Sequence, residues 1–312
     1  MESRNSWPDV SVIIPVHGDA PHLISTIESI RMQSFEEYEV IIILDRASQE
    51  IQTYARNLAL DFENFRVVIS KTPGISHALN SGIRESSGEL IARIDADDLM
   101  RNDRLALQKN FLEKHQEVVC VGSQVTKINV SGIRIGRSSF PGSNKLITST
   151  LLFRNCIAHP SVMYRRSSIL EVNGYRPDFD GVEDYDLWLR LSMIGQIRNI
   201  QKTLTSYRVW ENQVTTKKRH LIFENAKRVR ESFENSSVSQ RHEARFCEKD
   251  WLVSADYFNK SLQNFRNSGE KFSALQNLLN SFRITPSLTT RVCTGYVLNF
   301  ILARIRGCKR EN

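Results

Sequence analysis

A short acidic run, Asp95-Ala96-Asp97-Asp98, directly follows the apolar segment Leu90–Ile94. Carboxylates this close together repel one another unless a cation lies between them. Their oxygens are hard ligands that suit Mg²⁺ or Mn²⁺, and the phosphates of a bound nucleotide would complete the coordination. Aspartate is also favoured at helix N-termini, and Asp98 can serve in that way. For the three acids together we expect a divalent cation site.

Two further acids occupy positions where chemistry is possible. Asp45 ends the apolar run Val40–Leu44, where it can accept hydrogen bonds from a base or a ribose hydroxyl, or cap the helix that follows. Asp184 lies at the start of a predicted helix, where acids are favoured whatever the function. A carboxylate at the mouth of a site can also take a proton from an attacking hydroxyl. For the lone His159, structural and phosphate-facing roles are both open, and a structural role is favoured.

The elements that must position these acids form a predicted parallel sheet. Short apolar segments alternate with segments of helical period, which indicates buried strands with helices on both faces. Ligands of such sheets bind beyond the carboxyl ends of the strands, where Pro15-Val16-His17, Asp45 and the acidic run all fall. The expected strands are Val10–Pro15, Val40–Leu44, Arg66–Ile69 and Leu90–Ile94, and the expected helices are Leu23–Met32, Ile51–Phe62 and Ile75–Ser86.

Beyond a predicted helix at Asp103–His115 the pattern changes to that of a mixed second half of the same domain. Short strands are expected there, two of them joined by the turn-like Val130-Ser131-Gly132. The predicted segments are the strands Val118–Val121, Gln124–Asn129, Ile133–Ile135 and Leu204–Tyr207, the stretch Ile157–Tyr164 and the helix Asp184–Met193.

The remainder of the chain reads as a helical appendage, so we predict a catalytic domain at residues 1–215 and a basic helical region at 216–312. Amphipathic helices are expected around Phe246–Phe265 and Phe272–Phe282. The apolar part of a last helix, around Leu288–Ile305, is shorter than the roughly 20 residues that a membrane span needs. With arginine and lysine beside it, this helix can lie in a membrane interface or pack on the protein, and both alternatives are open.

Composition and charge narrow the class of protein. The 312 residues are 40% hydrophobic and 25% charged, as in ordinary globular proteins. Five scattered cysteines give no support to a disulfide framework or a zinc site. Residues 1–9 lack the apolar core of a signal peptide, and we therefore expect a cytoplasmic protein.

The net charge of +7 is unevenly distributed. Residues 216–312 hold 18 Lys and Arg against 9 Asp and Glu, whereas the first 215 residues hold 24 against 26. Such a tail attracts lipid headgroups, nucleic acid or an acidic polymer. Solvated faces of ordinary helices explain the charge equally well.

Taken in order, the motifs resemble those of the family 2 glycosyltransferases. The family's opening, its strand ending in Asp, its long signature ending in a DxD motif, its acceptor-side region ending in an ED motif and its closing segment all have counterparts. The resemblance covers about residues 8–215, and five motifs in the same order make coincidence improbable. The matching segments are VSVIIPVHGDAPHL, IIILDRAS, GISHALNSGIRESSGELIARIDADD, HPSVMYRRSSILEVNGYRPDFDGVEDYDLWLRL and LTSYRVWENQVT.

The resemblance implies a GT-A fold, an α/β Rossmann-like architecture with a mixed, mainly parallel sheet. It also implies inverting transfer of a sugar from a nucleotide-diphospho-sugar, UDP-linked in the commonest case, to an acceptor hydroxyl. Asp184 would be the catalytic base, and Mg²⁺ or Mn²⁺ would be bound by Asp97 and Asp98. The sequence departs from the usual pattern at Arg46, Ala47 and His17. These departures leave open which nucleotide base the donor carries. The nucleotide-sugar would contact Pro15, His17, Asp45, Asn80, Asp95 and Asp97.

Partners and rival functions follow from the same comparison. The resemblance suggests a saccharide or lipid-linked acceptor in bacterial polysaccharide biosynthesis, with the C-terminal helix at an anionic membrane surface, and no nucleic-acid partner is expected. A haloacid-dehalogenase-type phosphohydrolase also uses a DxD motif but requires Thr or Val where this chain has Leu99. The alternative function is a noncatalytic nucleotide-sugar-binding scaffold of the same fold. This chain retains all four carboxylates of the motifs, which argues against that alternative.

Overall fold

The computed structural model describes residues 8–152, 154–210 and 219–234. The described residues up to Thr148 and from Asn155 to Glu231 belong to one compact unit, which contains every predicted site residue. The predicted domain boundary at residue 215 and the three predicted helices beyond residue 245 lie outside the described residues, so they stay predictions.

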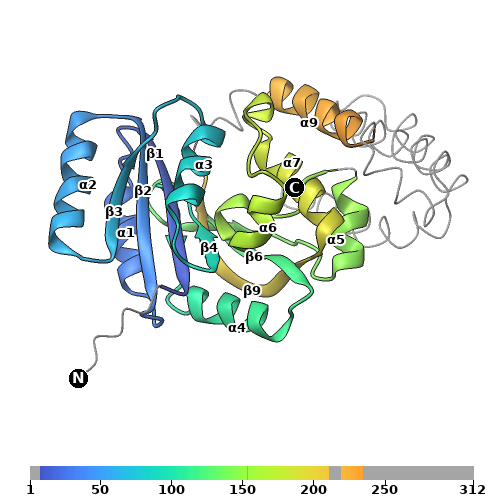
Figure 1. The fold of residues 1–312 in the computed structure, drawn as a ribbon, viewed down its shortest axis with the longest axis horizontal. Coiled ribbons are helices and arrows are strands. Elements are labelled where there is room, and N and C mark those ends of the chain that lie inside the picture. Colours follow the sequence, from blue (N-terminus) through green and yellow to red (C-terminus); the bar gives the residue numbers. More distant parts are fainter. Residues whose placement is uncertain (1–7, 153, 211–218, 235–312) are drawn as a thin grey trace, which may run out of the picture. The chain divides into compact units, whose positions relative to one another are not determined.

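The first half of the unit is a parallel sheet with crossover helices, as predicted (Figure 1). Its strands lie in the order β3-β2-β1-β4, and each pair of neighbours runs parallel. The strands are β1 (Val10–Gly18), β2 (Tyr38–Ala47), β3 (Phe65–Ile69) and β4 (Leu90–Arg93), and the helices between them are α1 (Leu23–Arg31), α2 (Gln49–Asp61) and α3 (Ile75–Glu85).

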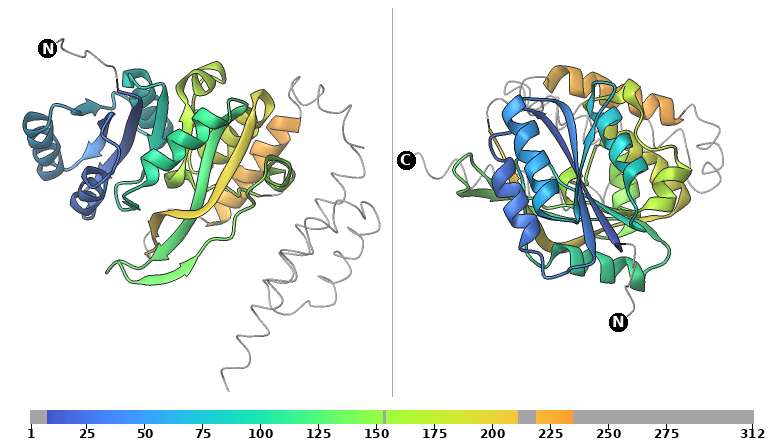
Figure 2. Two further views of the ribbon diagram at one scale, coloured as in Figure 1. Left: turned by 90° about the horizontal axis from the view of Figure 1, so that it is seen from below. Right: turned by 60° about the vertical axis from the view of Figure 1, so that its left-hand side comes forward.

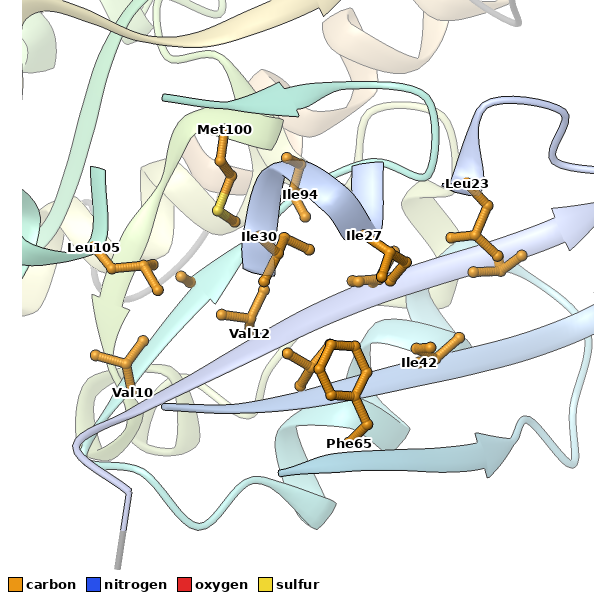
Figure 3. Packing of buried hydrophobic residues seen from close by; sticks show 14 of the residues in the cluster. Val10, Val12, Leu23, Ile27, Ile30, Ile42, Phe65, Ile94, Met100 and Leu105 are labelled. Carbon is orange, nitrogen blue, oxygen red and sulfur yellow. The ribbon is translucent and has the colours of Figure 1, made fainter. Parts of the chain in front are cut away.

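Both faces of β1, β2 and β4 are buried, which explains their unbroken apolar runs. Figure 3 shows Leu23, Ile27 and Ile30 of α1 packed over Val12 of β1 and Ile42 of β2. Helix α3 covers the opposite face. A Cβ added at its Gly82 would meet side chains of β1 and β2 at 2.8–3.2 Å, so a larger residue there would make Ile13 and Ile43 shift at this close approach between helix and sheet.

The second half continues the same sheet in the order β8-β6-β9-β5, with β7 paired to β6. Strand β8 runs antiparallel to β4 and β6, while β6 and β9 run parallel. Figures 1 and 2 show α4 on the side of α1 and α2, and α6 and α7 on the side of α3. The elements are β5 (Leu99–Met100), α4 (Arg104–Lys114), β6 (Val118–Ile128), β7 (Arg134–Arg137), α5 (Asn144–Leu151), β8 (Met163–Arg165), α6 (Arg166–Glu171), α7 (Glu183–Ile194), β9 (Gln196–Arg208) and α9 (Arg219–Glu234), with 3₁₀ turns at His159–Ser161 and Pro177–Phe179.

Several element boundaries in this half differ from the prediction. Residues 118–128 form one strand, not two, because β6 absorbs its irregular register against β9 without breaking. Strand β9 begins at Gln196, well before the predicted Leu204. Helix α5 and the two-residue strand β5, which pairs with the distant β9, were not predicted.

A buried arginine joins the two halves. Arg104 of α4 is fully buried and donates to the carbonyls of Arg93, Pro160 and Val162 at 2.7–3.0 Å. It also donates to Thr205 Oγ1 on β9 at 3.2 Å. Burial lowers the pKa of Arg104 to about 9, and these acceptors satisfy its polar atoms in place of water. A single side chain therefore connects β4, the 3₁₀ turn before β8, and β9.

Among the described residues, none of the helices has the length and apolar character needed to cross a lipid bilayer.

Candidate active site

The predicted acidic cluster forms just beyond the end of β4. The chain turns there, with the Asp98 amide donating to the Asp95 carbonyl at 3.2 Å. Asp95, Asp97 and Asp98 each offer a carboxylate oxygen, and these oxygens lie within 4.8 Å of one another. The run in the sequence is therefore a spatial cluster as well.

The end of β9 holds this cluster from the other side. The Trp210 indole Nε1 donates to Asp97 Oδ2 at 3.2 Å, and the Arg208 backbone amide donates to Asp98 Oδ1 at 2.7 Å. Arg208 Nε also donates to the Asp97 carbonyl at 2.8 Å. The sequence prediction assigned no role to Arg208 or Trp210. Their signal was present, because both lie in the segment that matches the family's closing motif.

The electrostatics of the cluster fit a cation. Burial, and then the charge of Asp95, raise the pKa of Asp97 to about 6. Burial, and then Asp95 and Asp97, raise the pKa of Asp98 well above its usual range. Oδ2 of Asp98 is buried and has no hydrogen-bond partner within the described part of the chain. These carboxylates are costly to ionise, and one of their oxygens has no hydrogen-bond partner among the described residues. Both features suit a divalent cation, because hard oxygen ligands bind such ions and a cation offsets the negative charge.

Asp95 is held differently from its two neighbours. Both terminal nitrogens of Arg93 donate to its carboxylate, with Nη1 2.8 Å from Oδ2. The Arg93 side chain is only 4% exposed. Burial lowers the pKa of Arg93, but the charge and hydrogen bonds of Asp95, with smaller contributions from Tyr175 and Glu183, outweigh that effect and raise it overall. Arg93 is thus a buried cation that interacts with the acidic cluster and with the start of α7.

The carboxyl ends of β1 and β2 bring Asp45 and His17 together. His17 Nδ1 lies 2.8 Å from the Asp45 carbonyl oxygen and 3.7 Å from Asp45 Oδ2. The Gly74 amide donates to Asp45 Oδ2 at 3.1 Å. Pro15 is buried in β1 opposite Ile43, whereas the His17 side chain is largely exposed. At the end of β1, Pro15 is therefore buried while the side chain of His17 faces solvent.

The start of α3 connects this region to the loop before α7. Next to Gly74, the Ser76 amide donates to Asp180 Oδ1 at 3.2 Å. Farther along α3, the Asn80 side chain donates to the Tyr175 carbonyl at 2.7 Å and accepts from the Tyr175 amide at 2.8 Å. Asn80 thus has both polar atoms engaged with backbone, and its predicted contact with the nucleotide-sugar stays a prediction.

Asp184 lies in the first turn of α7, partly buried. Its Oδ2 accepts from Asn155 Nδ2 at 2.6 Å and its Oδ1 from the Tyr185 amide at 2.7 Å. Burial raises the pKa of Asp184 to about 6, the two hydrogen bonds and Arg93 oppose that shift, and the charge of Asp95 adds to it. A carboxylate that titrates near neutrality can accept a proton and release it again.

Behind Asp184 lies a buried polar network that the sequence did not reveal. Burial, and then the charge of Asp184, raise the pKa of Glu183 to about 8. Glu183 Oε2 accepts from the Gly181 amide at 2.7 Å, and its Oε1 lies 3.7 Å from His159 Nδ1. His159 Nε2 in turn lies 2.8 Å from the Tyr175 hydroxyl. His159 is buried and bonded within the protein, as its favoured structural role requires.

The structure therefore connects all the predicted acids within one unit. Asp95, Asp97 and Asp98 form one cluster, and Asp45 reaches the loop before α7 through residues 74–76. The charges of Asp95 and Arg93 act on Asp184. The described residues thus hold an acidic cluster suited to a cation and a titratable carboxylate suited to act as a base, both within one unit.

A parallel sheet with acids at its carboxyl edge, continued by a mixed second half, is the architecture of the GT-A glycosyltransferases. TarS (1–349) of S. aureus in complex with UDP-GlcNAc matches with a TM-score of 0.64 at 15% identity, over 91% of this chain and 83% of that one. The chain covers 50% of the longer chain in another TarS structure. The mannosyltransferase PcManGT of Pyrobaculum calidifontis, in complex with GDP-Man and Mn²⁺, matches with a TM-score of 0.59 at 16% identity, over 95% and 81%.

The family is shown by sequence. Residues 11–173 match the model of glycosyl transferase family 2. The O-antigen biosynthesis glycosyltransferase WbnJ of Escherichia coli is 32% identical over 212 residues, which are 67% of this chain and 82% of that protein. The chain belongs to glycosyl transferase family 2.

Proposed function

We propose that the chain transfers a hexose from a UDP-linked donor to a hydroxyl of a saccharide or lipid-linked saccharide, with inversion at the anomeric carbon. The observation that carries the proposal is the joint placement of the Asp95–Asp98 cluster and Asp184 around the buried Arg93. The relative WbnJ, an O-antigen biosynthesis enzyme, supports a polysaccharide acceptor. The TarS complex with UDP-GlcNAc supports a UDP-linked donor.

Each group has a distinct role in this proposal. Asp45 contacts the base, Pro15 and His17 border the nucleotide pocket, Asp95 faces the ribose, and Asn80 borders the donor while bonded to Tyr175. Asp97 and Asp98 would hold Mg²⁺ or Mn²⁺, which offsets the charge that develops on the leaving diphosphate. The Mn²⁺ in the PcManGT complex supports such a site.

Asp184 is the proposed base. It takes the proton of the acceptor hydroxyl, whose oxygen attacks the anomeric carbon as the bond to the nucleoside diphosphate breaks. Asn155 fixes the orientation of the carboxylate, and a pKa of about 6 leaves it ionised near neutral pH. The cytoplasmic location of the protein stays a prediction.

A donor screen tests the proposal. Thermal unfolding of the purified full chain would be measured with UDP-glucose, UDP-galactose, UDP-GlcNAc and GDP-mannose, with and without Mn²⁺, because a bound donor stabilises the fold. A UDP-sugar should raise the melting temperature more strongly with Mn²⁺, and UDP should be released when acceptor is added. No shift with any donor would overturn the donor assignment. Binding without release of UDP, across a panel of acceptors, would favour the noncatalytic scaffold.

A further inference from the structure

The hairpin formed by the end of β6 and by β7 is apolar and exposed on both faces. Val130 in the turn is 52% exposed, and Ile133 and Ile135 are 64% and 56% exposed. In the left-hand view of Figure 2, this hairpin lies at the lower margin of the coloured ribbon. Neighbouring residues of a strand point to opposite faces, so exposure of every residue from Val130 to Ile135 means that neither face of the tip packs on the described protein.

The turn that presents these side chains is firmly built. Asn129 Oδ1 accepts from the amides of Ser131 at 3.1 Å and Ile133 at 2.9 Å. The Gly132 amide donates to the Asn129 carbonyl at 2.9 Å, and Gly132 takes a φ of +81° that glycine adopts without strain. The display of apolar side chains is therefore a defined feature of the fold.

The charge on this hairpin is of one sign. Lys127, Arg134 and Arg137 are exposed, and no described carboxylate forms an ion pair with them. The sequence from residue 118 to residue 170 contains no Asp or Glu. Exposed aliphatic side chains beside unpaired cations suit a surface that is apolar within and anionic outside, as a bilayer with acidic headgroups is. A second copy of the chain would present the same positive charge, which disfavours pairing of two such hairpins.

One residue connects the hairpin to the acidic cluster. A terminal nitrogen of Arg208 donates to the carbonyls of Asn129 at 3.1 Å and Val130 at 2.9 Å. The same side chain donates to the Asp97 carbonyl, and the Arg208 amide binds Asp98. A surface bound by the hairpin would therefore lie at a fixed place relative to the proposed donor site.

We propose that the β6–β7 hairpin docks on an anionic bilayer surface, with Val130, Ile133 and Ile135 in the interface and its three cations near the headgroups. This inference stands on the exposure and charge of the hairpin and does not depend on the donor or on the chemistry of transfer. Docking would keep the site beside a lipid-linked acceptor.

Vesicle sedimentation of the full chain tests the proposal, with phosphatidylethanolamine vesicles containing phosphatidylglycerol in a molar ratio of about three to one. The variant V130S/I133S/I135S should bind about tenfold or more weakly than the wild type, because three interfacial side chains are lost. Exposed aliphatic residues elsewhere provide a matched control, I24S/L60S/I69S, which should bind as the wild type does. The variant R134Q/R137Q should lose about tenfold in affinity and most of the salt dependence that its cations contribute.

Three outcomes would overturn the proposal. The first is that the wild type does not sediment with these vesicles. The second is that both triple-serine variants bind equally well, which would assign binding to another part of the chain. The third is that V130S/I133S/I135S dissociates an oligomer of the wild type in sedimentation velocity without vesicles, which would make the hairpin a contact between copies.

Discussion

In the parallel half of the sheet, β2 and β4 carry Asp45 and Asp95 at the ends of their own apolar runs. In the mixed half, Asp184 begins helix α7 and is held by Asn155, which lies 29 residues earlier in the chain. Local strand geometry places Asp45 and Asp95 after their apolar runs, with a further bond to Asp45 from the Gly74 amide 29 residues away. Asp184 follows no strand, and its side chain is held by the distant Asn155 as well as by the Tyr185 amide. Donor-side and acceptor-side chemistry should therefore respond to different substitutions, and each prediction below tests that separation.

The largest effect is expected at the connection between the halves. Arg104→Met removes a buried guanidinium and leaves the carbonyls of Arg93, Pro160 and Val162 without their donor. We expect a loss of about 3 kcal/mol or more in the free energy of unfolding, measured by urea denaturation. Arg101→Met, which breaks an exposed pair with Asp103, should cost less than about 1 kcal/mol. Equal losses would mean that Arg104 does not join the halves.

On the donor side, Asp97→Ala removes a proposed cation ligand. The affinity for donor in the presence of Mn²⁺ should fall by about a hundredfold or more, measured by calorimetry or by the Mn²⁺-dependent thermal shift. The half-buried Asp103, which pairs with Arg101, provides the control, and Asp103→Ala should bind donor normally. Mn²⁺-stimulated binding that persists in Asp97→Ala would reject the ligand role.

Where the two sides meet, Gly74→Ala tests the link between Asp45 and the loop before α7. Gly74 has a φ of +120°, and an added Cβ would lie 2.7 Å from Asp180 Oδ2. The backbone at residue 74 must shift, which moves the amide of that residue away from Asp45. Donor affinity should therefore fall by about tenfold. Gly132→Ala introduces a similar φ strain, at +81°, into open space. Its donor affinity should be unchanged, and a loss equal to that of Gly74→Ala would attribute the effect to strain alone.

The last prediction concerns the pH dependence of stability on the acceptor side. The pKa of Glu183 in the folded protein is about 8, raised from 4.5 chiefly by burial. The folded state therefore holds this proton more tightly, and stability falls as pH rises between the two values. Glu183→Gln lacks this dependence. Its free energy of unfolding minus that of the wild type should therefore increase as pH rises from about 5 to about 9. A difference that stays flat over this pH range for Glu183→Gln would argue that the proton of Glu183 is not held.

The sequence revealed those parts of the site that lie on buried parallel strands. Strands β1, β2 and β4 are covered on both faces, so their apolar runs and the acids that follow are visible as local patterns. The parallel strands and the acidic run after β4 were predicted in this way, and the start of α7 from the acids in its first turn, with the family resemblance supplying the roles.

The rest depends on contacts that leave no local pattern. Asn155 and Arg104 are single polar residues whose partners lie up to 101 residues away. Trp210 and Arg208 meet the acidic cluster only because β9 returns beside it. Strand β5 has two residues and exists only through its pairing with β9. Tertiary packing determines these features, and apart from the family's closing motif, which contains Arg208 and Trp210, no pattern in the sequence points to them.

The most direct test of the proposed division of roles is Asp184→Asn, measured for donor affinity and for turnover. If Asp184 takes the acceptor's proton while the Asp95–Asp98 cluster binds the donor, donor affinity should stay within about twofold and kcat should fall by about 10² or more. Sugar transfer by this variant at the wild-type rate would contradict the assignment.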